Sequence, residues 1–97
     1  MKDNIKSRFY SVDFTVCDYC GEVSIIHYVE YAKSVEVLEA LIHKDKKELS
    51  RDAHTVVSYT VSKADNDDIR EFLLEDKYIA QCILIEMLDI AFNREGQ

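Results

Sequence analysis

Residues 8–31 of this 97-residue chain, RFYSVDFTVCDYCGEVSIIHYVEY, carry the clearest signal of its fold. Apolar and polar side chains alternate through its first part, residues 8–16, as they do in a half-buried strand. The apolar positions of this part are Tyr10, Val12, Phe14 and Val16. Asp18 and Gly21 then supply turn chemistry, because glycine reaches positive φ without steric cost. The pattern predicts a strand followed by a tight turn.

The second part of the stretch, residues 22–31, alternates again, so the whole segment predicts a β-hairpin. Its main apolar stripe consists of Val23, Ile25, His27, Val29 and Tyr31. The opposite face is formed by Ser24, Ile26, Tyr28 and Glu30. Because apolar groups occur on both faces, we expect this second strand to lie in the centre of the sheet.

The rest of the chain adds two helical patterns and one more strand. Ser34 is a plausible N-cap for a helix that runs to about His43 or Lys44, followed by a loop or frayed extension over 44–52. Residues 54–62 are rich in β-branched side chains and predict a third strand. A second helix is capped by Asp65 or Asn66 and runs to about Phe92, with a break near Glu75 and Asp76.

These elements predict a single α+β domain over residues 1–97. The expected order is β-β-α-β-α, with a small, mostly antiparallel three-stranded sheet and helices on one face. No repeat, linker or low-complexity segment interrupts the chain.

The composition argues against catalysis. The chain has only two glycines, so it contains neither a dinucleotide-binding nor a phosphate-binding glycine motif. The nucleophile-elbow motif G-x-S-x-G and the zinc-protease motif H-E-x-x-H are absent too. We therefore expect a protein that is not an enzyme, with no catalytic residues and no cofactor. His27, on an apolar strand face, is expected to be a hydrogen-bonded sheet histidine.

The overall charge, from 12 basic and 19 acidic residues, is −7. Such a charge argues against direct binding to nucleic acid or to an anionic membrane, and favours a basic partner. The first six residues contain no apolar core of a signal peptide, and the apolar run at 79–90 is interrupted by charges. We expect a cytoplasmic protein.

The cysteines raise the question of a metal. Cys17 and Cys20 have the spacing of half a zinc knuckle, but the sequence offers no second pair of ligands at zinc-site spacing. Cys82 lies in an apolar helical pattern, where a small buried hydrophobe is the usual role. We expect reduced thiols in a plain hairpin turn and no metal, with a zinc site at Cys17 and Cys20 as the alternative.

The acidic charge is concentrated near the C-terminus. Residues 65–97 hold three basic and nine acidic side chains, a net charge of −6. A row of carboxylates on a rigid helix can occupy lysine and arginine sites that normally hold a nucleic-acid backbone. The candidate partner-binding acids are Asp65, Asp67, Asp68, Glu71, Glu75 and Asp76. Of these, Asp68, Glu71 and Glu75 are spaced to line one helical face. The alternative is a merely solvated helix face, because acids at a helix N-terminus are also favoured by capping and the dipole.

The outer face of the hairpin is a further candidate. Tyr28 and Glu30 lie opposite the main apolar stripe and would extend an acidic, tyrosine-bearing contact surface. The alternative is that a helix covers this face too.

The run ADNDDIREFLLED at residues 64–76, on a small acidic α+β chain, resembles the small phage or prophage proteins that inhibit host defence, such as anti-CRISPR proteins. The resemblance implies occlusion of a basic nucleic-acid-binding surface, such as that of a CRISPR surveillance complex, in the host cytoplasm, with DNA mimicry as one means. Twelve basic residues favour a mixed interface over pure mimicry. The alternatives are an immunity or antitoxin protein that binds a basic toxin, and a structural module with a zinc-stabilised hairpin.

Overall fold

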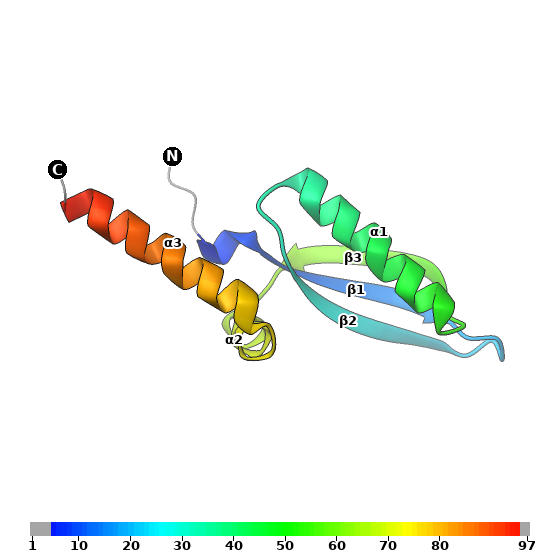
Figure 1. Ribbon diagram of the computed structural model, residues 1–97. Helices are drawn as coiled ribbons and strands as arrows, with labels where there is room; N and C mark the ends of the chain where they lie inside the picture. Colours follow the sequence, from blue (N-terminus) through cyan, green and yellow to red (C-terminus); the bar gives the residue numbers. More distant parts are fainter. Residues whose placement is uncertain (1–4, 96–97) are drawn as a thin grey trace. The chain divides into compact units, whose positions relative to one another are not determined.

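The computed structural model describes residues 5–95. Its elements follow the predicted α+β order, with the last helix divided in two (Figure 1). They are η1 (Ile5–Arg8), β1 (Phe9–Cys17), β2 (Val23–Tyr31), α1 (Val35–Arg51), β3 (Thr55–Lys63), α2 (Asn66–Glu75) and α3 (Lys77–Glu95). They group into two compact units, residues 1–65 with the sheet and α1, and residues 66–97 with α2 and α3. Each unit is described by itself.

The sheet of the first unit is antiparallel, as predicted, with the strand order β2-β1-β3. The central strand is therefore β1, and the prediction that the second strand is central is wrong. After α1 the chain forms β3, which pairs with the edge of β1 that β2 does not occupy. This pairing leaves β2 as an edge strand.

The register of the strands decides which side chains face the core. Residues directly opposite each other in an antiparallel pair point to the same face. Phe14 lies opposite Ile26, and Val12 opposite Tyr28, so the even-numbered residues of β2 share the face of the fully buried β1 stripe. Ile25 of the expected inner stripe is instead 70% exposed. The predicted orientation of β2 is the reverse of the observed one.

Helix α1 covers this inner face of the sheet (Figure 1), and the two layers enclose the core. Its buried members are Val12, Phe14, Val16, Ala32, Leu38, Ile42 and Leu49. An irregularity in the β1–β3 pairing places Val56 opposite Val16 and Ser58 opposite Thr15, so that Val57 is left over. Val56 then packs against the core, whereas Val57 is exposed.

Helix α1 begins as predicted and ends later than predicted. The Ser34 hydroxyl accepts a hydrogen bond from the Val37 amide at 3.2 Å, which confirms the N-cap. The helix continues to Arg51 and ends in a Schellman motif, in which the His54 amide bonds the Leu49 carbonyl at 3.0 Å and the Ala53 amide bonds the Ser50 carbonyl at 3.2 Å. Ala53 takes φ 63°, a position usually held by glycine, so the sequence carries no signal for this helix end.

Replacing Ala53 with glycine should stabilise the protein. A left-handed conformation costs an L-residue about 1–2 kcal/mol, and the larger unfolded-state entropy of glycine offsets part of the gain. We expect Ala53→Gly to raise the free energy of unfolding by about 1 kcal/mol, measured by urea titration. Ala40→Gly, at an exposed position inside α1, is the control and should lower it by a similar amount. A loss of stability in Ala53→Gly would contradict the proposed strain.

The second unit consists of α2 and α3, which pack against each other. The predicted break near Glu75 and Asp76 is confirmed. Asp76 accepts a hydrogen bond from the Ile79 amide through Oδ1 at 3.1 Å, so it caps the start of α3. None of the helices described in residues 5–95 is long and apolar enough to cross a membrane.

Candidate functional site

Helix α2 presents the predicted carboxylates unevenly. Asp67, Glu71 and Glu75 follow one another at intervals of four residues and are exposed, so they form a row along one side of the helix. Asp67 Oδ1 lies 3.6 Å from Arg70 Nη1, and both side chains are largely in solvent. Exposed pairs of this kind are weak and screened by salt, so the row keeps its acidic character. We call Asp67, Glu71 and Glu75 the α2 acid row.

The other acids of this segment, Asp65, Asp68 and Asp76, also interact within the chain. Asp76 caps α3, as described above. Asp68 is half-buried, and both Asp65 and Asp68 make further interactions of their own. Within the α2 acid row, Asp67 lies in the first turn, where the helix dipole also favours an acid, whereas Glu71 and Glu75 lie beyond it.

The predicted outer hairpin face does not exist as expected. Because β2 has the opposite orientation, Tyr28 and Glu30 lie on the face of the sheet that α1 covers. The Tyr28 ring packs edge-on against Phe14, with centroids 5.5 Å apart. Both residues are half-buried, and the alternative of a helix over this face is the one observed. Tyr28 and Glu30 therefore take no part in an exposed contact surface.

Glu30 instead meets a second carboxyl group, Asp45 of α1. Asp45 is only 6% exposed, and its Oδ2 atom has no hydrogen-bond partner in the described part of the chain. The two side chains share a hydrogen bond, in which the protonated Glu30 donates to Asp45. Two carboxyls in one buried site cannot both ionise cheaply. The first unit therefore contains a pair of carboxyl groups, Glu30 and Asp45, that share a proton beneath α1.

The protonation of this pair is shifted accordingly. Burial first, and then the hydrogen bond to Asp45, raises the pKa of Glu30 to about 8. Burial also raises the pKa of Asp45, and the hydrogen bond from Glu30 opposes that rise. The nearby Glu48 raises both values, whereas Lys44 lowers both. Burial likewise raises the pKa of Tyr28, with Asp45 as the largest charged contributor.

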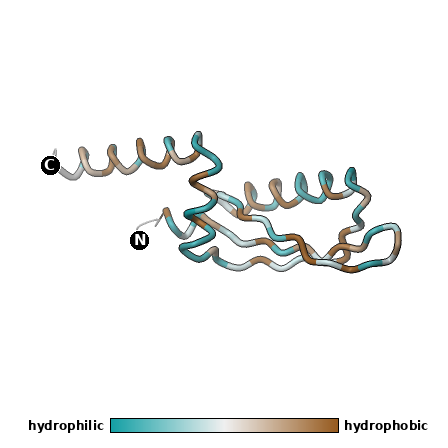
Figure 2. Tube along the Cα trace, turned by 90° about the horizontal axis from the view of Figure 1, so that it is seen from below, coloured by the Kyte–Doolittle hydropathy of each residue, from teal (hydrophilic) through white to brown (hydrophobic). Residues whose placement is uncertain are grey.

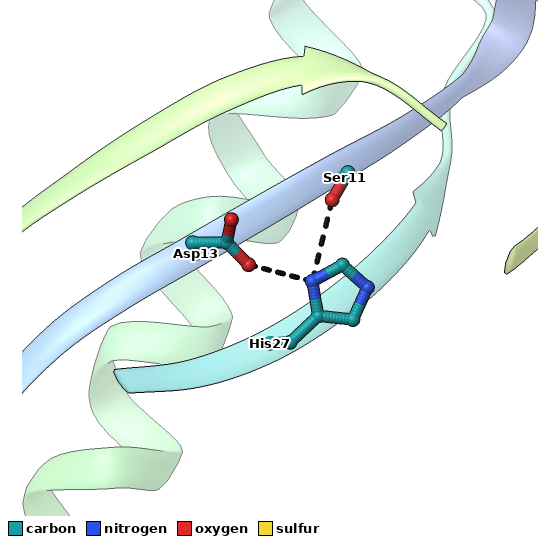
Figure 3. Close-up of polar contacts among 3 residues, drawn as sticks. All are labelled: Ser11, Asp13 and His27. Atoms are coloured by element: carbon teal, nitrogen blue, oxygen red, sulfur yellow. Dashed lines mark hydrogen bonds and ion pairs between the residues drawn. The ribbon is translucent and has the colours of Figure 1, made fainter. Parts of the chain in front are cut away.

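On the opposite face of the sheet, β1 and β2 bring Ser11, Asp13 and His27 together (Figure 3). His27 Nδ1 lies 2.6 Å from Asp13 Oδ1 and 3.3 Å from Ser11 Oγ. Asp13 and His27 are directly opposite in the strand register, which places them as cross-strand neighbours. The expectation of a hydrogen-bonded sheet histidine is confirmed.

The same three residue types form the triad of serine hydrolases, but here their geometry differs. A triad needs the carboxylate on one ring nitrogen and the hydroxyl on the other, so that the ring can carry a proton between them. In this protein Ser11 and Asp13 both contact Nδ1. Ser11 is also only 8% exposed. The arrangement holds the imidazole in place and does not activate the hydroxyl.

The hairpin loop is built around Asp18. Its Oδ1 atom accepts hydrogen bonds from the Cys20 and Glu22 amides, each at 2.9 Å, and Gly21 takes φ 85°. The loop is thus an Asx-type turn with the predicted positive-φ glycine.

Cys17, Cys20 and Cys82 are free thiols, and Cys82 is exposed rather than buried as expected. Within residues 5–95, no group of three or more His, Cys, Asp or Glu side chains is placed to hold a metal ion.

An open depression of about 460 Å³ lies where the end of α1 meets the start of β3. Its lining includes Lys46, Ser50 and His54. The Lys46 ammonium lies 4.5 Å from the centroid of the Tyr59 ring, so a cation–π contact already engages it. Polar side chains also line it at Tyr19 and Thr55, and the buried His54 Nδ1 atom has no hydrogen-bond partner among the described residues.

The sequence predicts an acidic face of Asp68, Glu71 and Glu75 on α2, whereas the exposed row is Asp67, Glu71 and Glu75. The sequence does not predict the Glu30–Asp45 pair. Helical spacing reveals a row within one element, whereas the pair joins residues of two elements that meet only after packing. The one available signal was the acid at an inward position of α1, since Asp45 follows Leu38 and Ile42 at helical spacing.

Comparison of the chain with protein-family models, curated proteins and solved structures finds no match.

Proposed function

We propose that this chain is a non-enzymatic binding protein whose α2 acid row occupies a basic, nucleic-acid-binding surface of a partner protein or complex. The observation that supports the proposal is the exposure of Asp67, Glu71 and Glu75 in one row. The i,i+4 pairs in this row repel each other slightly, and the repulsion is relieved when a cationic surface faces them.

The spacing of the row suits a site made for phosphates. Four helical residues rise about 6 Å, so the carboxylates follow each other at that interval. Successive phosphates of one DNA strand are separated by a comparable distance, with about 3.4 Å of axial rise plus the helical path. Lysine and arginine side chains that hold a nucleic-acid backbone can therefore contact the carboxylates in turn.

The partner class follows from this chemistry. We propose a protein or complex that binds nucleic acid in the cytoplasm, with a CRISPR surveillance complex as the example that the sequence resemblance supplies. An immunity-type role against a basic toxin would use the same row. Affinity capture from a host lysate, followed by mass spectrometry, identifies which partner is bound.

Charge reversal of the row should slow binding. We expect the double variant Glu71→Lys, Glu75→Lys to reduce the association rate with the captured partner about tenfold or more at low salt, because steering by complementary charge is lost. The difference should shrink as salt rises, since screening acts within about 8–10 Å at physiological ionic strength. Surface plasmon resonance over a salt series measures both effects.

The control makes the same change in net charge elsewhere. Glu36 and Glu39 are exposed on α1, so Glu36→Lys, Glu39→Lys shifts the total charge equally without touching α2. This control should bind nearly as fast as the unmodified protein and displace nucleic acid from the partner equally well. If the α2 variant displaces nucleic acid as efficiently as the control at low salt, the proposal is wrong.

A further inference from the structure

A row of exposed apolar side chains along α3 is not used by the proposed function. Four of these apolar residues and the polar Gln81 follow at intervals of three and four residues, and we call the five positions the α3 seam: Tyr78, Gln81, Ile85, Leu88 and Phe92. The four large apolar members are between 49% and 76% exposed, and Leu84 beside them is 57% exposed. In Figure 2 hydrophobic positions recur along much of α3. We propose that a second copy of this chain covers the α3 seam.

The spacing of the α3 seam indicates that the surface covering it is another helix. Apolar residues that alternate at steps of three and four keep to one side of a helix and form the a/d positions of a coiled coil. Such a stripe packs with knobs into holes against another helix with the same period. The more buried residues of α3, Ile79 and Ile83, lie on a different side from the seam. The seam is therefore a second apolar face of the same helix.

The seam fits a second copy of itself in antiparallel orientation. Tyr78 and Phe92 are each seven residues from Ile85, so a two-fold axis at Ile85 brings Tyr78 of one copy level with Phe92 of the other. The same axis brings Gln81 level with Asp89 of the second copy, where its amide can donate to the carboxylate. The seam itself carries no charge, although the chain has a net charge of −7. An acidic molecule can associate with itself through such a face without like-charge repulsion.

The area agrees with this assignment. From their exposed fractions and ordinary side-chain areas, the four apolar seam residues and Leu84 leave on the order of 700 Å² in solvent. The largest apolar patch on a typical monomer is about 300–600 Å², and a standard interface buries about 800 Å² per partner. Over its 19 residues α3 is about 28 Å long, which is enough to pair along its whole length. Pairing would place two α2 acid rows on one particle, although it does not depend on them.

The test is the molar mass in solution. Sedimentation equilibrium over micromolar to submillimolar concentrations should give twice the chain mass of 11.3 kDa at the upper end. The double variant Ile85→Lys, Leu88→Lys should weaken the dimer about 100-fold or more, because each copy then places two ammonium groups against an apolar face. Circular dichroism verifies that the variant remains folded, as expected for substitutions at exposed positions.

Two controls separate the seam from other exposed apolar positions. Met87→Lys, Ile90→Lys makes the same change at the same spacing on α3 outside the seam, and it should leave the dimer intact. The single variant Ile25→Lys places one lysine at an exposed apolar position on the open face of the sheet, and it should also leave the dimer intact. A monomer at every concentration would overturn the proposal, and so would a dimer that only Ile25→Lys dissociates.

The orientation has its own test. In a background with Cys17, Cys20 and Cys82 replaced by serine, a Tyr78→Cys protein mixed with a Phe92→Cys protein should form a mixed disulfide under mild oxidation. Each variant alone should cross-link poorly, because the two ends of the helices lie far apart in an antiparallel pair. Efficient cross-linking of each variant with itself would indicate parallel helices and contradict the antiparallel assignment.

Discussion

Replacing Glu30 with glutamine is expected to remove a fall in stability of about 2–4 kcal/mol that the unmodified protein shows between pH 5 and pH 9. The fall arises because the folded protein keeps a proton on Glu30 that the unfolded chain releases. Burial and the hydrogen bond to Asp45 raise the pKa of Glu30 from its ordinary 4.5 to about 8. The buried Asp45 carboxylate then receives a proton donor that it would otherwise lack.

The sign of the effect follows from proton binding. Between pH 4.5 and about 8 the folded state holds more protons than the unfolded state, so the free energy of unfolding decreases as pH rises. Each pH unit in this window is worth up to about 1.4 kcal/mol for one proton. The contribution is complete below pH 4.5 and is lost once the pH passes about 8. Partial solvation of the half-buried Glu30 reduces the total below the full value.

Urea titrations at pH 5, 7 and 9, followed by circular dichroism, measure this dependence. In Glu30→Gln the amide still donates to Asp45 but does not titrate, so its pH profile should be flatter and its stability at pH 9 higher than that of the unmodified protein. Glu75→Gln removes an exposed carboxyl group and should keep the original slope. An unchanged slope in Glu30→Gln would show that the pair does not hold the proton in the folded state.

The second large effect is expected at Phe14. Truncation to alanine should destabilise the protein by about 3–5 kcal/mol, the range for buried phenylalanines. Phe14 is 0% exposed on the central strand, and its ring lies 5.5 Å from that of Tyr28 and 5.8 Å from that of Tyr59. Since a chain of 97 residues has about 5–15 kcal/mol of stability in total, the variant should be close to unfolding at 37 °C.

A matched truncation on the other face of the sheet provides the comparison. Ile25→Ala removes a side chain that is 70% exposed on β2, so it should change the free energy of unfolding by less than about 0.5 kcal/mol. Thermal and urea unfolding of both variants give the two values. Equal losses at Phe14 and Ile25 would mean that the β2 register described here does not hold in solution.

Local chemistry predicted the elements of this protein well. The Asp18 turn and the Ser34 cap depend on a side chain bonding backbone amides a few residues away, and both are observed. The length of the second helical pattern predicts the break near Asp76, and the structure adds that the Asp76 side chain caps α3. The sequence did not predict that α1 continues to Arg51, because the Schellman motif at its end has Ala53 in the position that glycine usually occupies. Helical spacing places Glu71 and Glu75 on one side of α2, but it groups them equally well with Asp67 or Asp68, and the structure leaves Asp67 exposed and Asp68 half-buried.

Local sequence patterns were enough to predict the α+β class, the order of the elements and the position of the hairpin turn. Three features depend on how the elements pack: which strand is central, which face of β2 is buried, and the contact of Glu30 with Asp45. The physical reason is the period of two in a strand: β2 carries apolar groups on both faces, so its own pattern fits either orientation. Pairing with the buried stripe of β1 selects one of them, and that choice places Tyr28 and Glu30 beneath α1.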